Sequence, residues 1–254
     1  MGLFDFFKKK GKAPAPQITL QATKTIIETE PLQLEGLDKI TPNCYGNYML
    51  PPVARFTVYG INPQTNRKNK RVYAATSEAD AAQQAEAAGL TGPFEITQEP
   101  LEAATEPQAE YAKSLGLQLP KDACVADASA LLDRIEKQDP KPAAPGMLEY
   151  IAGKGWKGSS LIGFKEALWQ AYNAGLDTRE KVALYAYCVA KVEKNQQPGN
   201  LLTDREKGRY FKFADEVMAD QKLFASFEEW GSWKYCAEPE RRSKIYQAVK
   251  EKLL

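Results

Sequence analysis

The chain has 254 residues, of which 43% are hydrophobic, and its 34 Lys and Arg nearly balance its 33 Asp and Glu at a net charge of +1. This length corresponds to one large domain or two to three small ones, and the near-zero net charge argues against nucleic-acid binding through overall charge. The chain contains no histidine, which excludes Ser-His and Cys-His nucleophile pairs and all histidine-ligated metal sites.

The four cysteines, Cys44, Cys124, Cys188 and Cys236, lie far apart and form no C-x-x-C motif. This spacing is typical neither of a zinc site nor of a disulfide scaffold, so we expect reduced cysteines and no bound metal or cofactor. No apolar run approaches the roughly 20 residues that a membrane-spanning helix needs. We therefore expect a cytoplasmic protein without an integral membrane span.

Residues 1–24 are predicted to form a flexible basic tail, with five lysines and one aspartate. The first ten residues combine four apolar side chains with three lysines: Leu3, Phe4, Phe6, Phe7, Lys8, Lys9 and Lys10. Such a segment either anchors weakly on an anionic lipid surface or docks on a partner protein, and the sequence leaves both interpretations open. An irregular acidic segment follows at residues 25–54.

Residues 55–100 are predicted to form a ββαβ module. Alternation in Arg55–Ile61 indicates a strand that places Phe56 and Val58 on one face. The later elements are a polar turn at 62–69, a return strand at 71–75, a helix at 77–89 and a third strand at 94–97. In this reading the helix starts at a capping serine and stops at a glycine.

Residues 101–138 are predicted to form a helix–loop–helix module. A capping box at Thr105 opens the first helix, and Gly116 ends it. Residues 139–146 contain three prolines and one glycine, which indicates a linker and the clearest domain boundary of the chain. Residues 147–254 show only helical periodicity and are predicted to form an α-helical bundle. The predicted fold class is therefore α+β, mainly α.

Residues 153–160 superficially resemble a phosphate-binding loop. Such a loop needs a lysine directly after its second glycine and a buried strand before its first. Here Ser159 takes the place of the lysine and a helical pattern precedes the loop, so an NTPase site is not expected. Paired carboxylates are also present, but their spacing does not distinguish them from a solvated surface, and no catalytic residue is assigned.

Two groups of residues have the composition of nucleic-acid contacts. One is the predicted hairpin tip, which carries Arg67, Lys68, Lys70 and Arg71 and has the charge to bind backbone phosphates. The other is the loop with Lys154, Trp156 and Lys157, in which an aromatic ring lies between two cations. For the first group the alternative is a solvated turn. For the second it is a helix connector with its Trp in the core.

Part of the chain resembles known modules. The sequence Ala104-Thr-Glu-Pro-Gln108, with Leu119-Pro120 and Ser129-Ala-Leu-Leu132 after it, resembles the helix–extended-loop–helix unit of SAP type over residues 104–138. Residues 55–97 resemble a small ββαβ module found in bacterial multidomain proteins. The first resemblance implies DNA binding and the second implies an interaction unit.

These observations lead to three hypotheses. The first is a non-enzymatic, modular protein that docks on DNA, RNA or a nucleoprotein partner. The second is a protein–protein adaptor, with or without a weak membrane association through residues 1–10 and without a nucleic-acid role. The third is an enzyme with a histidine-free site in the C-terminal bundle.

Overall fold

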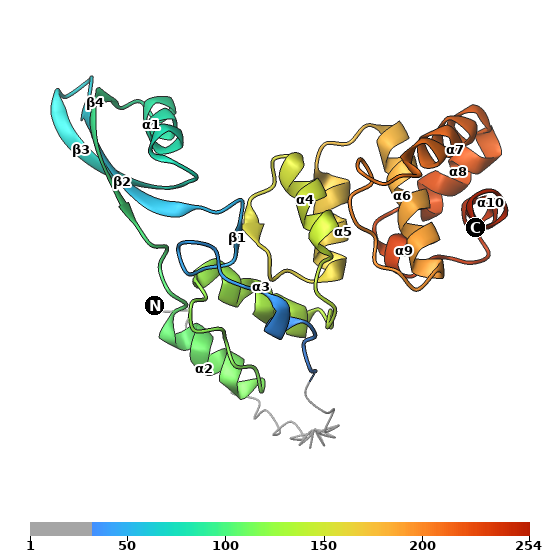
Figure 1. Ribbon diagram of the computed structural model, residues 1–254. Coiled ribbons are helices and arrows are strands. Elements are labelled where there is room, and N and C mark those ends of the chain that lie inside the picture. Colours follow the sequence, from blue (N-terminus) through green and yellow to red (C-terminus); the bar gives the residue numbers. More distant parts are fainter. Residues whose placement is uncertain (1–31) are drawn as a thin grey trace, which may run out of the picture. The chain divides into compact units, whose positions relative to one another are not determined.

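The computed structural model describes residues 32–254 (Figure 1). The predicted tail at 1–24 and the candidate lipid-binding residues Leu3 to Lys10 lie outside the described residues. Helices make up 47% and strands 16% of the structure, which confirms the α+β, mainly α class. Buried apolar residues form two separate clusters, a small one in the ββαβ module and a large one among the helices.

The ββαβ module consists of β2 (Ala54–Asn62), β3 (Arg67–Ala75), α1 (Glu78–Ala87) and β4 (Thr91–Glu99). The three strands form an antiparallel sheet in the order β3-β2-β4, with α1 on one face (Figure 1). The predicted inward residues Phe56 and Val58 are fully buried there. Alternation therefore identified the correct face of the central strand.

The ends of α1 follow the predicted signals. The Ser77 hydroxyl accepts a hydrogen bond from the Asp80 amide at 3.1 Å, and this satisfies a donor of the first helical turn. Gly89 has φ of +83°, a left-handed conformation that glycine adopts without a steric penalty. Both positions are therefore set by local chemistry.

The hairpin differs from the prediction in one respect that concerns the candidate site. The turn comprises only Pro63–Asn66, and Arg67 already pairs with Asn62 across the two strands. The Asn62 carbonyl accepts the Asn66 amide at 2.8 Å, and its side-chain oxygen accepts the Gln64 amide at 2.9 Å. These bonds close the turn early, so the four cations lie on strand β3 and not on a turn.

Two short elements precede the module, η1 (Leu37–Lys39) and β1 (Met49–Leu50). The helical region contains α2 (Glu106–Ser114), α3 (Val125–Glu136), α4 (Pro145–Gly153), β5 (Gly158–Ser159), α5 (Phe164–Asn173), α6 (Thr178–Glu193), α7 (Lys207–Ala219), α8 (Gln221–Trp230), α9 (Lys234–Ala237) and α10 (Lys244–Leu253). Strands β1 and β5 pair with each other in an antiparallel ladder.

Helix α6 is the central helix of this region. All of its residues from Val182 to Ala190 are buried, including the thiol of Cys188, as its nearly continuous apolar sequence predicts. Among the neighbouring helices, Met218 of α7 is exposed, and α10 starts after Ser243, whose hydroxyl accepts the Tyr246 amide.

The capping box of α2 is confirmed, because Thr105 and Gln108 hydrogen-bond each other reciprocally. The residues at 139–146, in contrast, do not form an exposed linker. Asp139 and Ala143 are buried, and the Ala143 amide donates to the Ile162 carbonyl at 3.1 Å. Pro145 is the first residue of α4. Proline was compatible with this packed conformation because helix N-termini tolerate it.

Candidate binding site on strand β3

The loop with Lys154 and Trp156 is not an open cationic surface. The Lys154 ammonium lies 2.6 Å from Glu180 Oε1, and the Tyr150 hydroxyl donates to the same oxygen at 2.9 Å. Both charged side chains are largely buried, with exposed fractions of 26% and 15%. The charge of Lys154 is therefore satisfied within the helical region and does not face a partner.

Trp156 packs against the core. Its ring covers Gly158 so closely that a Cβ atom at that position would lie 2.3 Å from Trp156 Cζ2. Of the three residues in this group, Lys157 alone is exposed, and no ion pair to it is formed within residues 32–254. A single lysine beside a packed Trp does not form a stacking site of the kind that the sequence suggested.

Ser159 lies in the short strand β5, four residues before Gly163, the N-cap of α5. The Ser159 hydroxyl donates to the Asp127 carboxylate at 2.6 Å. Asp127 is completely buried and also accepts the amides of Tyr48 and Cys124, at 3.2 and 2.9 Å. This carboxylate joins three segments that are distant in sequence, and sequence reasoning missed it. Its one local signal was its position three residues after the N-cap of α3.

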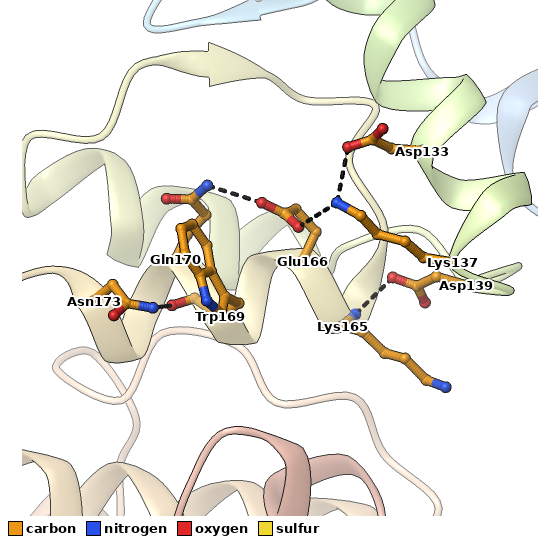
Figure 2. A network of polar contacts seen from close by, with 8 residues as sticks. All are labelled: Asp133, Lys137, Asp139, Lys165, Glu166, Trp169, Gln170 and Asn173. Carbon is orange, nitrogen blue, oxygen red and sulfur yellow. Dashed lines mark hydrogen bonds and ion pairs between the residues drawn. The ribbon is translucent and has the colours of Figure 1, made fainter. Parts of the chain in front are cut away.

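A second polar cluster joins α3 to α5 (Figure 2). The Lys137 ammonium lies 2.8 Å from Asp133 and 3.2 Å from Glu166. Glu166 in turn accepts a hydrogen bond from the Gln170 side chain at 2.9 Å. These groups neutralise one another between two helices, an arrangement that suits a structural contact more than acid–base chemistry.

Asp139 belongs to the same region and caps α5, because its carboxylate accepts the Lys165 amide at 2.7 Å. Burial raises the pKa of Asp139, while the amides of Lys165 and Glu166 and the charge of Arg134 oppose this rise. A Cβ atom at position 163 would lie 2.1 Å from the Asp139 carboxylate, so the glycine there admits the cap. Within residues 32–254, no group of three acidic or thiol side chains is placed to hold a metal ion.

The cations of β3 contrast with these internal clusters, because most of their polar atoms face outward. Lys68 forms an exposed ion pair with Glu95 at 2.6 Å, and its ammonium lies 5.0 Å from the Tyr59 ring centre. Arg71 donates to the Ala88 carbonyl at the end of α1, at 3.1 Å. Arg67 and Lys70 form no ion pair with any described residue.

Strand alternation distributes the four cations over both faces of the sheet. Lys68 and Lys70 belong to the face that carries Tyr59, whereas Arg67 and Arg71 share the face of the buried Val58 and of α1. Strand β3 is an edge strand, so these side chains flank its free edge above and below. The edge therefore carries positive charge on both sides.

The backbone of this edge has free hydrogen-bonding groups. The Ala74 carbonyl accepts the Gln84 side chain at 3.2 Å, so the peptide groups of Ala74 point away from β2. Alternate residues share this direction, which places the N–H and C=O groups of Lys68, Lys70 and Val72 at the outer edge. None of these groups has a hydrogen-bond partner within the described part of the chain.

The opposite edge of the sheet is different. Strand β4 contains Pro93, which lacks an amide hydrogen, and its pairing with β2 shifts register between Tyr59 and Ile61. Both features disturb a strand edge and protect it from further pairing. In contrast, β3 pairs with β2 without interruption over its full length and contains neither proline nor glycine. The sheet thus has one blunted edge and one regular edge.

No helix among residues 32–254 is long and apolar enough to cross a membrane. The predicted SAP-type and ββαβ resemblances remain predictions. Comparisons with protein-family descriptions, with curated proteins and with solved structures found no match for this chain.

Proposed function

We propose that this protein is a non-enzymatic adaptor that binds a partner protein along the free edge of β3. The observation that carries the proposal is the row of unpaired peptide groups at Lys68, Lys70 and Val72 on a regular edge strand. An extended segment of a partner satisfies such groups by adding a strand to the sheet, a common mode of peptide recognition. In the helical region, the buried carboxylates of Asp127 and Asp139 accept hydrogen bonds from other groups of the protein. They therefore serve the fold, which supports a binding role over an enzymatic one.

The substitution Val72→Pro tests the proposal. It removes one outward amide, and an edge strand tolerates proline where its N–H faces solvent, so the ladder with β2 stays intact. The matched control Val72→Thr keeps the amide and the β-branched shape. Binding partners are captured by the three proteins from lysate with and without nuclease treatment and are quantified by mass spectrometry.

We expect the wild type and Val72→Thr to retain the same partner and Val72→Pro to lose it. Circular dichroism checks that the proline variant keeps its sheet. Equal capture by all three proteins would show that the edge of β3 is not the binding site. A partner that disappears after nuclease treatment would favour the nucleic-acid hypothesis over the adaptor.

A second candidate is docking on DNA or RNA, which the free charges of Arg67 and Lys70 favour. Because Lys68 and Arg71 already have partners, two new phosphate contacts are expected. Neutralising Arg67 and Lys70 together should lower the slope of log affinity against log salt by about 0.9 per contact on duplex DNA, or about 0.7 on single strands. Anisotropy of a labelled oligonucleotide measures this slope, and absence of wild-type binding at about 50 mM salt excludes this candidate.

A further inference from the structure

Strand β3 has two chemically different halves. Residues 67–71 carry four cations and no acid, whereas residues 72–75 are Val, Tyr, Ala and Ala. Val72 is 50% exposed and is thus an apolar side chain on the open surface. On the basis of the proposed function, we infer that the added segment is an extended peptide that is acidic beside residues 67–71 and apolar beside Val72, where the free part of the edge ends because Gln84 occupies the Ala74 carbonyl.

The charge distribution favours a continuous acidic run in the peptide. Side chains of an added strand alternate between the two faces of the sheet. An acid on the face of Tyr59 lies beside Lys68 or Lys70. Its neighbour, on the face of Val58 and α1, lies beside Arg67 or Arg71. Acids opposite residues 67, 68, 70 and 71 are therefore matched, and only the position opposite Asn69 has no cation directly across it. Opposite charges directly across two strands attract each other.

The cations that this peptide requires are accessible. Arg67 and Lys70 have no ion-pair partner to lose within residues 32–254, and the Lys68–Glu95 pair is exposed on both sides, at 51% and 72%. Exposed ion pairs contribute little to folding stability. Lys68 can therefore exchange Glu95 for an acid of the peptide at small cost to the module.

A second copy of this chain is a poor occupant of the same edge. Pairing β3 with another β3 doubles the cations of the ribbon and adds no acid, so like charges repel. A nucleic acid satisfies the cations, but it uses neither the outward peptide groups nor the apolar half. Experiments that depend on the outward peptide groups or on the apolar half therefore distinguish a bound peptide from a bound nucleic acid.

The test uses purified full chain and four synthetic peptides of about eight residues, the length of an ordinary strand. The first has a β-branched half of Val and Thr followed by an acidic half, the order that matches an antiparallel addition to β3, and the second has the same composition in scrambled order. The third replaces each acid by lysine. The fourth repeats the first with N-methylated backbone amides, which removes the donors needed for strand addition.

We expect the first peptide to bind about tenfold more tightly than the scrambled one, the effect of two cross-strand charge pairs of ordinary strength. The lysine and N-methylated peptides should not bind detectably. The double variant Arg67→Glu/Lys70→Glu should abolish the preference for the acidic peptide, because residues 67–71 then carry two cations and two acids. Lys113→Glu/Lys121→Glu, which changes two exposed lysines outside the module, should leave the preference unchanged.

The outcomes separate the two proposals. Equal binding of the acidic, scrambled and lysine peptides, with loss only on N-methylation, would overturn the inferred peptide chemistry and leave the adaptor function standing. Binding that survives N-methylation would contradict strand addition and thus both proposals. Binding of a labelled oligonucleotide without binding of any peptide would replace them with nucleic-acid docking.

Discussion

The ββαβ module and the helical region use their charged groups in opposite ways. In the helical region, Lys154–Glu180 and Lys191–Asp204 are ion pairs in which every side chain is at most 26% exposed. In the module, the charges of β3 lie on the surface, and of its four cations only Lys68 has an ionic partner among the described residues. Charge therefore stabilises internal contacts in one region and is available for binding in the other.

This difference indicates where the protein can bind a ligand with little loss of folding stability. A buried ion pair that loses one partner leaves an uncompensated charge, which is strongly destabilising, so the helical pairs are unsuited to exchange. The small apolar core of the module, in contrast, lies between α1 and the inner sheet face. Binding at the edge of β3 leaves that core intact.

The substitution Phe56→Ala should have the largest effect and tests whether the two regions are separate cooperative units. Phe56 is fully buried in the module core, and such truncations cost about 3–5 kcal/mol. All four Trp residues lie at positions 156, 169, 230 and 233, so Trp fluorescence reports only on the helical region. We expect fast hydrogen exchange in residues 54–99 and an unchanged fluorescence transition. A matching shift of that transition would show that both regions unfold together.

Asp127→Ala should have a comparable or slightly smaller effect, and in the helical region. The substitution leaves the buried donors of Tyr48, Cys124 and Ser159 without their acceptor, which should cost about 3 kcal/mol. Urea unfolding followed by Trp fluorescence measures the loss. Asp133→Ala on the same helix removes only an exposed ion pair and should change stability by less than about 1 kcal/mol. Equal effects of both variants would refute the assigned role of Asp127.

Asp204→Asn should have a moderate, pH-dependent effect. Burial raises the pKa of Asp204, but the Lys191 ammonium at 2.9 Å and the Glu206 amide more than offset this, so the folded-state pKa lies below its ordinary value. A carboxyl group whose pKa is lower in the folded state stabilises the protein at pH values above its unfolded-state pKa. This stabilisation is lost as the pH falls through the folded-state pKa. We expect the free energy of unfolding of the wild type to exceed that of the variant by roughly 1 kcal/mol above about pH 5. This difference should shrink below about pH 4. A difference independent of pH would exclude the ion pair as its cause.

Glu95→Gln should have the smallest effect and sharpens the comparison most directly. It removes the exposed partner of Lys68, and we expect a change in the free energy of unfolding below about 0.5 kcal/mol. Hydrogen exchange in residues 54–99 measures it. A loss as large as that of Asp127→Ala would show that Lys68 is structurally committed and unavailable to a partner.

Local sequence signals predicted a large part of the fold. The cap at Ser77, the capping box at Thr105 and the continuous apolar run of α6 depend on residues within a few positions of one another. The alternation of β2 identified its buried face for the same reason. Each of these features follows from the helix or strand period and from hydrogen bonds to the nearest backbone groups.

The candidate site was predictable only in part. The cations of β3 are evident as a run in the sequence, but their position on an edge strand depends on the early closure of the turn by Asn62. The free peptide groups carry no sequence signal, because every residue except proline has the same backbone groups. Which edge of a sheet stays open follows from strand order, a property of the whole module.

The sequence by itself determined the helices, the central strand and the positions of the charges. The tertiary structure alone decided which charges remain available, because the partners of Lys154 and Asp127, which are Glu180 and Ser159, lie far from them along the chain. It also decided that the prolines of residues 139–146 lie in a packed segment. The physical reason is range: periodicity and capping act over a few residues, whereas burial and ion pairing depend on which distant segments the fold brings together.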